Sequence, residues 1–236
     1  MQNKIKILST RPLQAAIIDE AAEQGIDISV QSFIETEAIQ SIEVQQEIEQ
    51  ALLQSATVVF TSMNAVEAVA AYMNDEIPDW IIYCMGQTTQ ELVKQYFGED
   101  SIAGTADDAT ELAESIAAED YMDEVVFFCG DQRRDELPAI LRNNDIEVNE
   151  IMVYHTIPTP HAVGAEYHGI LFYSPSAVDS FFSKNKPGSE TSFFAIGKTT
   201  AAAIKKYNSS IIVVSDKPGK ENLVKKAINY FVNNER

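Results

Sequence analysis

The sequence of 236 residues lacks the features of several specialised classes of protein. No apolar run approaches the roughly 18 residues that a membrane span needs, and the first five residues lack the long apolar stretch of a secretory signal. There are only two cysteines, Cys84 and Cys129, each within an apolar strand-like run. We therefore expect a cytoplasmic protein that has no membrane partner and whose cysteines are buried, reduced thiols rather than a disulfide.

Basic residues are also scarce. Lysine and arginine number 17 against 36 aspartates and glutamates, a net charge of −19, which argues against a nucleic-acid partner. The chain contains neither Gly-x-x-x-x-Gly-Lys-Ser/Thr nor Gly-x-Gly-x-x-Gly, so nucleotide binding is poorly supported, and no Gly-x-Ser-x-Gly elbow indicates a serine hydrolase. A hydrolase with paired carboxylates stays open, because 36 acidic residues make any single pair uninformative.

The sequence offers no plausible set of metal ligands. It has no Cys-x-x-Cys spacing. Its three histidines, His155, His161 and His168, fall within one short window, but no carboxylate or cysteine completes a set with them. We expect structural or surface roles for these histidines, and neither a metal nor a cofactor.

What the sequence does contain is an internal repeat, which is the first feature to seek in any chain. Residues 58–66 match residues 170–178 at an offset of 112, and residues 83–89 match residues 194–200 at an offset of 111. A helical stretch near residue 112 matches another near residue 223 in the same register. Segments that stay in register over more than fifty residues indicate two homologous halves.

The parts of the chain before these segments pair as well. Residues 5–8, followed by Arg11, resemble residues 125–129, followed by Arg133 and Arg134, and each leads to a helical stretch and a second strand. Each half therefore alternates strands and helices four times, which predicts α/β architecture with parallel sheets covered by helices on both faces. The alternation alone leaves open whether the first strand-helix-strand unit stays with its own half.

The repeat also marks candidate binding loops. In parallel sheets, ligands bind beyond the carboxyl ends of the strands, where loops lead into helices. Asn64 with Glu67, and Ser176 with Asp179, fit capping-box spacing and predict helices that start at residues 64 and 176. Such loops present backbone N–H groups that attract carboxylates and phosphates. Each loop alone could be an ordinary capped loop. Four equivalent loops, at residues 61–63, 86–87, 174–175 and 197–198, predict a cleft with matching anion sites on its two walls.

The motifs together resemble the uroporphyrinogen-III synthase family. Each motif is weak by itself, but they occur in order over nearly the whole chain. They are Ser-Thr-Arg-Pro at 9–12, Phe-Thr-Ser-x-Asn-Ala-Val at 60–66, Gly-x-x-x-Arg…Leu at 130–137, Val-Tyr-x-Thr at 153–156, Phe-x-Ser-Pro-Ser-Ala-Val at 172–178 and Ala-Ile-Gly-x-Thr-Thr-Ala at 195–201. The sequence departs from the family at Tyr173, where threonine is common, and at Asn64, where some members carry arginine.

The resemblance implies a fold of two similar three-layer α/β domains with parallel sheets, joined by a two-stranded β-ladder. One domain would comprise residues 1–33 plus 162–236, and the other residues 44–148. Residues 34–43 and 149–161 would form the ladder, so the chain would cross between the domains twice. A monomer is expected.

The resemblance also implies a reaction that needs no cofactor. Hydroxymethylbilane, a linear tetrapyrrole with eight carboxylates, would lose water and close with ring D inverted, giving uroporphyrinogen III. The enzyme would act mainly by holding its reactive substrate in one geometry. Tyr154 would protonate or hydrogen-bond the departing hydroxyl group, the alternative being a linker tyrosine without a catalytic role. The expected substrate-binding residues are Arg11, Ser62, Asn64, Gly86, Thr89, Gly130, Arg134, Ser174, Ser176, Gly197, Thr199 and Thr200.

Two other functions remain compatible with these residues. One is a non-catalytic protein with two lobes that binds a tetrapyrrole. The other is an inactive paralogue that has kept the fold without turnover.

Overall fold

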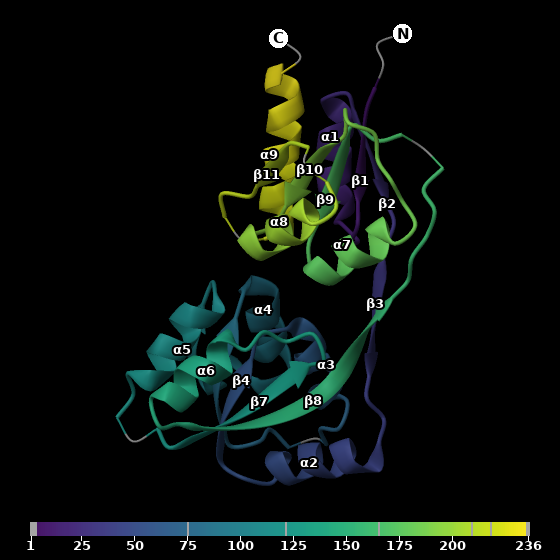
Figure 1. The fold of residues 1–236 in the computed structure, drawn as a ribbon. Helices are drawn as coiled ribbons and strands as arrows, with labels where there is room; N and C mark the ends of the chain where they lie inside the picture. Colours follow the sequence, from purple (N-terminus) through teal and green to yellow (C-terminus); the bar gives the residue numbers. More distant parts are fainter. Residues whose placement is uncertain are drawn as a thin grey trace. The chain divides into compact units, whose positions relative to one another are not determined.

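The computed structural model describes residues 4–74, 76–120, 122–164, 166–208, 210–217 and 219–234 (Figure 1). The chain divides into two compact units. Unit 1 comprises Met1–Glu35 and Ile157–Arg236, and unit 2 comprises Thr36–Thr156. Within the described residues, every helix is too short or too polar to cross a membrane.

Unit 1 is a sheet of five parallel strands between two layers of helices. The strand order is β11-β10-β9-β1-β2. Side chains on one face of the sheet pack with α1 and α9, and those on the other face with α7 and α8. Its elements are β1 (Ile5–Ser9), α1 (Ala15–Glu23), β2 (Ile26–Val30), β9 (Gly169–Phe172), α7 (Pro175–Phe182), β10 (Ser192–Ala195), α8 (Lys198–Lys205), β11 (Ile212–Val214) and α9 (Lys220–Asn234).

Unit 2 repeats this plan with one more strand. The sheet order is β3-β8-β7-β4-β5-β6; α2, α3 and α4 cover one face, and α5 and α6 the other. Its elements are β3 (Ile34–Ala38), α2 (Ile42–Leu52), β4 (Ala56–Phe60), α3 (Met63–Ala70), β5 (Trp80–Met85), α4 (Gln87–Phe97), the 3-10 turn η1 (Glu99–Ser101), β6 (Ile102–Ala106), α5 (Ala109–Ala117), β7 (Glu124–Gly130), α6 (Glu136–Asn143) and β8 (Glu147–Pro158).

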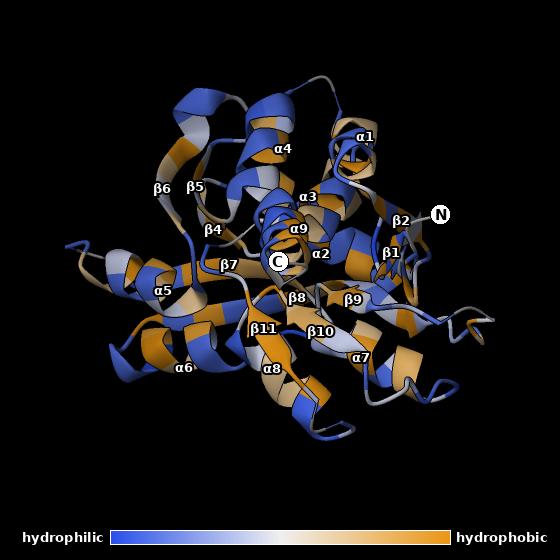
Figure 2. Cartoon of the chain, turned by 90° about the horizontal axis from the view of Figure 1, so that it is seen from above, coloured by the Kyte–Doolittle hydropathy of each residue, from blue (hydrophilic) through white to orange (hydrophobic). Residues whose placement is uncertain are grey.

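The helices and strands follow the hydrophobic pattern of the sequence. Successive strand residues such as Ile170, Leu171 and Phe172 are all buried because helices cover both faces. The helices are amphipathic, and Figure 2 shows them as alternating hydrophilic and hydrophobic segments, whereas β11 is mostly hydrophobic. The predicted α/β class with parallel sheets is confirmed.

The two sheets are equivalent strand by strand. In the repeat, β4, β5 and β6 correspond to β9, β10 and β11, and β1 and β2 correspond to β7 and β8. The order β6-β5-β4-β7-β8 in one sheet is therefore the order β11-β10-β9-β1-β2 in the other. Apart from β3, each sheet takes three strands from one half of the sequence and two from the other half.

Strands β3 and β8 contain the two points at which the chain passes between the units. They pair with each other. The Ile39 N–H donates to the Val153 carbonyl at 2.9 Å, and the Thr159 N–H donates to the Phe33 carbonyl at 2.9 Å. Residue numbers rise along one strand as they fall along the other, so the pairing is antiparallel. Figure 1 shows β8 as a long, curved strand with β3 beside it.

The expected alternation of four strands and four helices in each half differs from the structure in two respects. The described residues of the first half add β6 and α5, besides β3, and those of the second half add β11 as a fifth strand. The second strand of the second half, β8, is not followed by a helix: the described residues between Pro158 and β9 are non-helical. Pro158 and Pro160 explain the difference, because proline lacks a backbone N–H and disfavours helical conformation in the residue before it.

Candidate active site

Helix α3 begins one residue earlier than predicted, and a different residue caps it. Ser62, not Asn64, is the N-cap, and its hydroxyl accepts a hydrogen bond from the Asn64 N–H at 3.2 Å. In unit 1, Ser174 caps α7 in the same way, with its hydroxyl accepting from the Ala177 N–H at 3.2 Å. Each serine lies two residues after the end of its strand and has extended backbone, and its short side chain can reach the N–H groups of the first turn. The prediction of helix starts at residues 64 and 176 is therefore corrected to 63 and 175.

A β-bulge at the end of β7 determines where Tyr154 points. Cys129 pairs with Met152, but the next residue, Gly130, pairs with Tyr154, so Val153 is an extra residue in β8. Without a bulge, neighbouring residues would point to opposite faces of the sheet. Here Val153 and Tyr154 both pack against the core on the α3 face. The bulge thus turns the Tyr154 ring toward the start of α3.

The Tyr154 ring lies against the backbone of Gly130. A Cβ atom placed on Gly130 would lie 2.5 Å from Cε2 and 2.8 Å from the hydroxyl oxygen of Tyr154. Burial raises the pKa of Tyr154 above its usual value of 10.0, and hydrogen bonds with the side chains of Ser62 and Asn64 act in the opposite direction. Tyr154 is therefore a neutral phenol at neutral pH, with two polar groups at its oxygen. The structure brings together four of the expected site residues: Ser62, Asn64, Gly130 and Tyr154.

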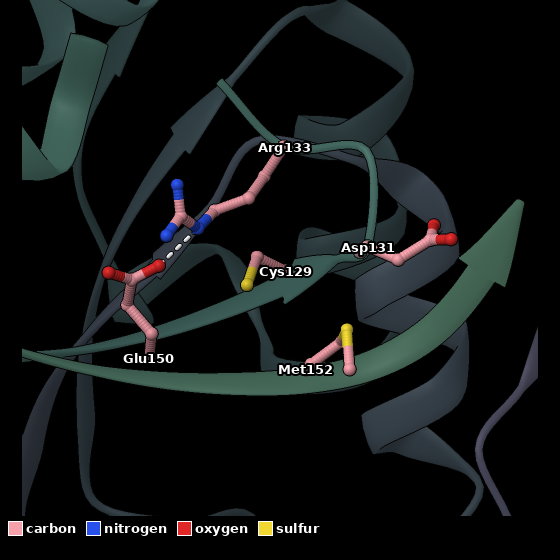
Figure 3. A pocket seen from close by; sticks show the side chains of 6 residues that line it. Cys129, Asp131, Arg133, Glu150 and Met152 are labelled. Carbon is pink, nitrogen blue, oxygen red and sulfur yellow. Dashed lines mark ion pairs between the residues drawn. The ribbon is translucent and has the colours of Figure 1, made fainter. Parts of the chain in front are cut away.

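A pocket of about 310 Å³ lies at the same end of β7 (Figure 3). An ion pair between Arg133 and Glu150 borders it. Arg133 also pairs with Asp135, and Arg142 reaches Glu150 at 2.8 Å. The lining residues are Cys129, Gly130, Asp131, Arg133, Glu150 and Met152. The charge of Arg133 is thus matched by carboxylates of its own unit.

The remaining expected residues of unit 2 are Arg134, in the loop that follows Gly130, and two residues at the start of α4. Arg134 is half exposed and pairs with Glu136 at 3.2 Å. Gly86 precedes α4 with φ = +84°, a left-handed conformation that glycine adopts most readily. Thr89, in the first turn of α4, is only 5% exposed. At this helix start, the backbone N–H groups are therefore better placed to meet a ligand than the Thr89 side chain.

The equivalent helix start in unit 1 has the same order of residues, although Gly197 has extended backbone (φ = −165°) where Gly86 is left-handed. Gly197 precedes α8, and the side chain of Thr199 is exposed. Thr200, in the first turn of α8, is 3% exposed. Ser176 follows the capping residue Ser174 in the first turn of α7 and is partly exposed.

Two basic residues lie near each other in unit 1. Arg11 follows β1, and its carbonyl accepts a hydrogen bond from the Ser9 hydroxyl at 2.7 Å. The Ser9 hydroxyl is also 3.3 Å from the Tyr173 hydroxyl. Burial raises the pKa of Tyr173 to about 12, opposed by the Ser9 hydrogen bond and the charge of Arg11. Burial and the charge of Arg11 together lower the pKa of Lys220, the first residue of α9. Arg11 and Lys220, with the neutral phenol of Tyr173 near Arg11, therefore lie close together at the carboxyl edge of the sheet.

A family model for uroporphyrinogen-III synthase HemD matches residues 15–225. The chain belongs to the uroporphyrinogen-III synthase family.

Individual relatives agree with this assignment. The porphyrin biosynthesis protein HemD of Ruminiclostridium josui is 25% identical over 227 residues, covering 88% of this chain. The match covers 45% of that relative, so the chain spans less than half of its length. Two solved structures share the fold. Uroporphyrinogen-III synthetase from Helicobacter pylori 26695 has a TM-score of 0.65 at 15% identity, covering 96% of this chain and 99% of the other. A mutant uroporphyrinogen III synthase from Thermus thermophilus has a TM-score of 0.63 at 13% identity, covering 98% and 100%.

The sequence of this uroporphyrinogen-III synthase family member did not lead us to predict Tyr173 and Lys220 as site residues, although both lie near Arg11. Tyr173 was noted only as a departure from the usual threonine, although it takes the place that Thr61 has in the first half. Lys220 takes the place of Ala109 in the repeat. A basic residue at a helix start in so acidic a chain was the available signal, since the helix dipole disfavours a cation there.

The two cysteines are buried in the cores, and His161 and His168 make packing and hydrogen-bond contacts. Cys84 and Cys129 are free and buried, as predicted, and burial raises the pKa of each thiol to about 11. His168 accepts a hydrogen bond from the Lys6 N–H at 3.0 Å, and the His161 ring packs edge-on against Phe33. Among the described residues, no three histidines, cysteines or carboxylates are grouped so that they could hold a metal ion.

Proposed function

We propose that this chain is a cyclising hydro-lyase that converts hydroxymethylbilane into uroporphyrinogen III, with loss of water and inversion of ring D. Membership of the uroporphyrinogen-III synthase family supports the reaction class. The observation that carries the proposal is the neutral phenol of Tyr154, which lies against Gly130 with Ser62 and Asn64 at its oxygen.

In the proposed reaction, Tyr154 is the general acid. Its phenol donates a proton to the terminal hydroxyl group of the substrate, which leaves as water and produces an azafulvene cation. The hydrogen bonds of Ser62 and Asn64 stabilise the phenolate that remains. The pyrrole ring at the other end attacks through its substituted carbon to give a spiro intermediate. Fragmentation and reclosure invert that ring, and the proton released on closure returns to Tyr154.

The carboxylates of the substrate need binding groups in a protein that is itself strongly acidic. We assign them to the helix starts that follow the strand ends, where the first backbone N–H groups have no partner within the helix. The contributing residues are those at the starts of α3 (Ser62, Asn64), α4 (Gly86, Thr89), α7 (Ser174, Ser176) and α8 (Gly197, Thr199, Thr200), with Gly130, Arg134 and Arg11. Lys220 joins Arg11 and Arg134 as a third cation. Local amides and a few cations then bind the polyanion despite the net charge of −19.

The decisive experiment couples the purified protein to hydroxymethylbilane synthase and separates the product isomers. Enrichment of isomer III over the spontaneous isomer I supports the synthase. Isomer I alone, in the same proportion as without the protein, refutes it and leaves the non-catalytic tetrapyrrole-binding protein or the inactive paralogue.

The acid role of Tyr154 has its own test. Replacing Tyr154 by phenylalanine keeps the ring against Gly130 and removes only the hydroxyl group. We expect kcat for isomer III to fall about 100-fold without being abolished, because general acids typically contribute factors of this order and the bound geometry remains. Tyr72→Phe is the matched control, because Tyr72 is partly buried against the same core. Full activity of Tyr154→Phe would exclude the acid role.

We also propose that the protein acts as a cytoplasmic monomer. Its two free, buried thiols fit a reducing compartment. Light scattering at several protein concentrations measures the oligomeric state, and a stable dimer would contradict this part of the proposal.

A further inference from the structure

The bulge that directs Tyr154 needs support beyond the β7–β8 ladder. The paired register of β7 ends at Gly130, opposite Tyr154. The strand β8 nevertheless continues to Pro158. Tyr154 therefore lies where the ladder with β7 is interrupted by the bulge and then stops, although β3 still pairs with the other side of β8.

Asp131 supplies that support with its backbone and its side chain. Its N–H donates to the carbonyl of Tyr154 at 3.2 Å. Its Oδ1 accepts a hydrogen bond from the Thr156 N–H at 2.9 Å. One residue thus binds β8 on both sides of His155, and its carboxylate takes the place of the backbone carbonyl that a longer β7 would offer. A carboxylate is a strong acceptor for a backbone N–H.

The carboxylate of Asp131 is available for this role because the nearby arginine has other partners. Figure 3 shows the Asp131 carboxylate pointing away from the Arg133–Glu150 ion pair. The second oxygen, Oδ2, lies 3.7 Å from Nδ1 of His155 and 3.4 Å from Nε2 of Gln132. Both carboxylate oxygens therefore face residues of β8 or of the adjoining loop.

We propose that Asp131 is a positioning residue for Tyr154: its carboxylate holds the segment Tyr154–Thr156 in the bulged register that keeps the phenol over Gly130. The effect on turnover rests on the proposed function. The hydrogen bond to the Thr156 N–H does not rest on it. The negative charge of Asp131 also contributes to the raised pKa of Tyr154, after burial and alongside Cys129.

Three substitutions separate the acceptor from the charge. Asp131→Asn keeps an oxygen acceptor at the same reach and removes the charge, Asp131→Glu keeps the charge and moves the oxygen by one methylene group, and Asp131→Ala removes both. We expect Asn to retain most of kcat, and Glu and Ala to lower it about 10- to 100-fold with KM changed much less, because a displacement near 1 Å of a catalytic group has effects of this size. An active Glu variant beside an inactive Asn variant would overturn the proposal, since charge rather than acceptor position would then matter.

Hydrogen exchange of the Thr156 amide tests the positioning directly and without any turnover. Asp131→Ala and Asp131→Glu should speed this exchange at least tenfold, whereas Asp131→Asn and the control Gln132→Ala should leave it near the wild-type rate. Unchanged protection in both the Ala and the Glu variants would refute the proposal. If the wild-type protein makes no isomer III, the proposed function fails, but the exchange result still decides whether Asp131 holds β8.

A double substitution shows whether Asp131 acts through Tyr154. In the Tyr154→Phe background, which lacks the hydroxyl group to be positioned, Asp131→Ala should lower the residual kcat less than threefold. An undiminished effect would mean that Asp131 influences turnover by another route, and the proposal would be wrong.

Discussion

Replacing Gly130 by alanine should push the Tyr154 ring out of its place. Gly130 does not have positive φ, so alanine fits its backbone, and the effect is purely steric. The new Cβ would lie 2.5 Å from Cε2 of Tyr154, about 0.9 Å short of the 3.4 Å at which ordinary contact begins, and closer still to Cζ. The ring or the strand that carries it must therefore move, because real Cβ atoms essentially never lie within 3.0 Å of such atoms.

The displacement has two expected consequences. Overpacking of this kind destabilises a protein by about 1–3 kcal/mol. A shift near 1 Å also moves the phenol relative to Ser62 and Asn64, so kcat for isomer III should fall by up to about 100-fold. Urea unfolding measures the first effect and the coupled isomer assay the second. The matched control is Gly188→Ala, because a Cβ on Gly188 meets nothing within 4 Å and its backbone is not left-handed.

A double-mutant cycle separates the clash from any other effect of alanine at this position. Tyr154→Ala removes the ring, so Gly130→Ala should lower the free energy of unfolding very little in that background. The coupling energy between the two sites should therefore account for most of the loss of about 1–3 kcal/mol that Gly130→Ala causes alone. The same cost in both backgrounds, or a single Gly130→Ala variant with normal stability and turnover, would refute this account of the site.

Three further predictions follow from the charges and thiols. Lys220→Ala should raise KM about tenfold with little change in kcat, because a charged hydrogen bond to the polyanion is lost; Lys220→Arg should restore KM, and an unchanged KM in the alanine variant would remove Lys220 from the site. The phenol of Tyr154 is the active form and its pKa is raised above 10.0, so kcat should show no loss from its ionisation below about pH 10; a falling limb near pH 8 that disappears in Tyr154→Phe would contradict this. Cys84 and Cys129, each with a pKa of about 11, should react with a disulfide reagent at pH 8 only after unfolding, and rapid reaction of the folded protein would show that they are accessible.

Much of the fold was predictable because its signals are local. Strands covered on both faces read as unbroken apolar runs, such as residues 58–60 and 170–172, and their loops recur at a constant offset. The prediction of a helix directly after β8 was wrong, because it followed the symmetry of the repeat and gave too little weight to Pro158 and Pro160. The helix starts were misplaced by one residue because Ser62 and Asn64 both suit a cap. Only the end of the preceding strand decides between them.

The candidate site was predictable in its members more than in its geometry. Gly130 and Tyr154 occur in motifs that the sequence displays, but their contact depends on the extra residue Val153 in β8. A bulge is decided by pairing with another strand, and no spacing within β8 reveals it. The role of Asp131 was hidden for the same reason, because its partner Thr156 is 25 residues away along the chain.

The exchange of strands between the two sheets has a consequence for synthesis on the ribosome. Unit 2 is one continuous stretch, Thr36–Thr156, and can fold as soon as it has emerged. The strands β1 and β2 are made before unit 2, but their sheet is completed only when β9, β10 and β11 follow. Two strands and one helix are only marginally stable by themselves. We therefore expect β1, α1 and β2 to remain unassembled while unit 2 folds, until β9, β10 and β11 have been synthesised.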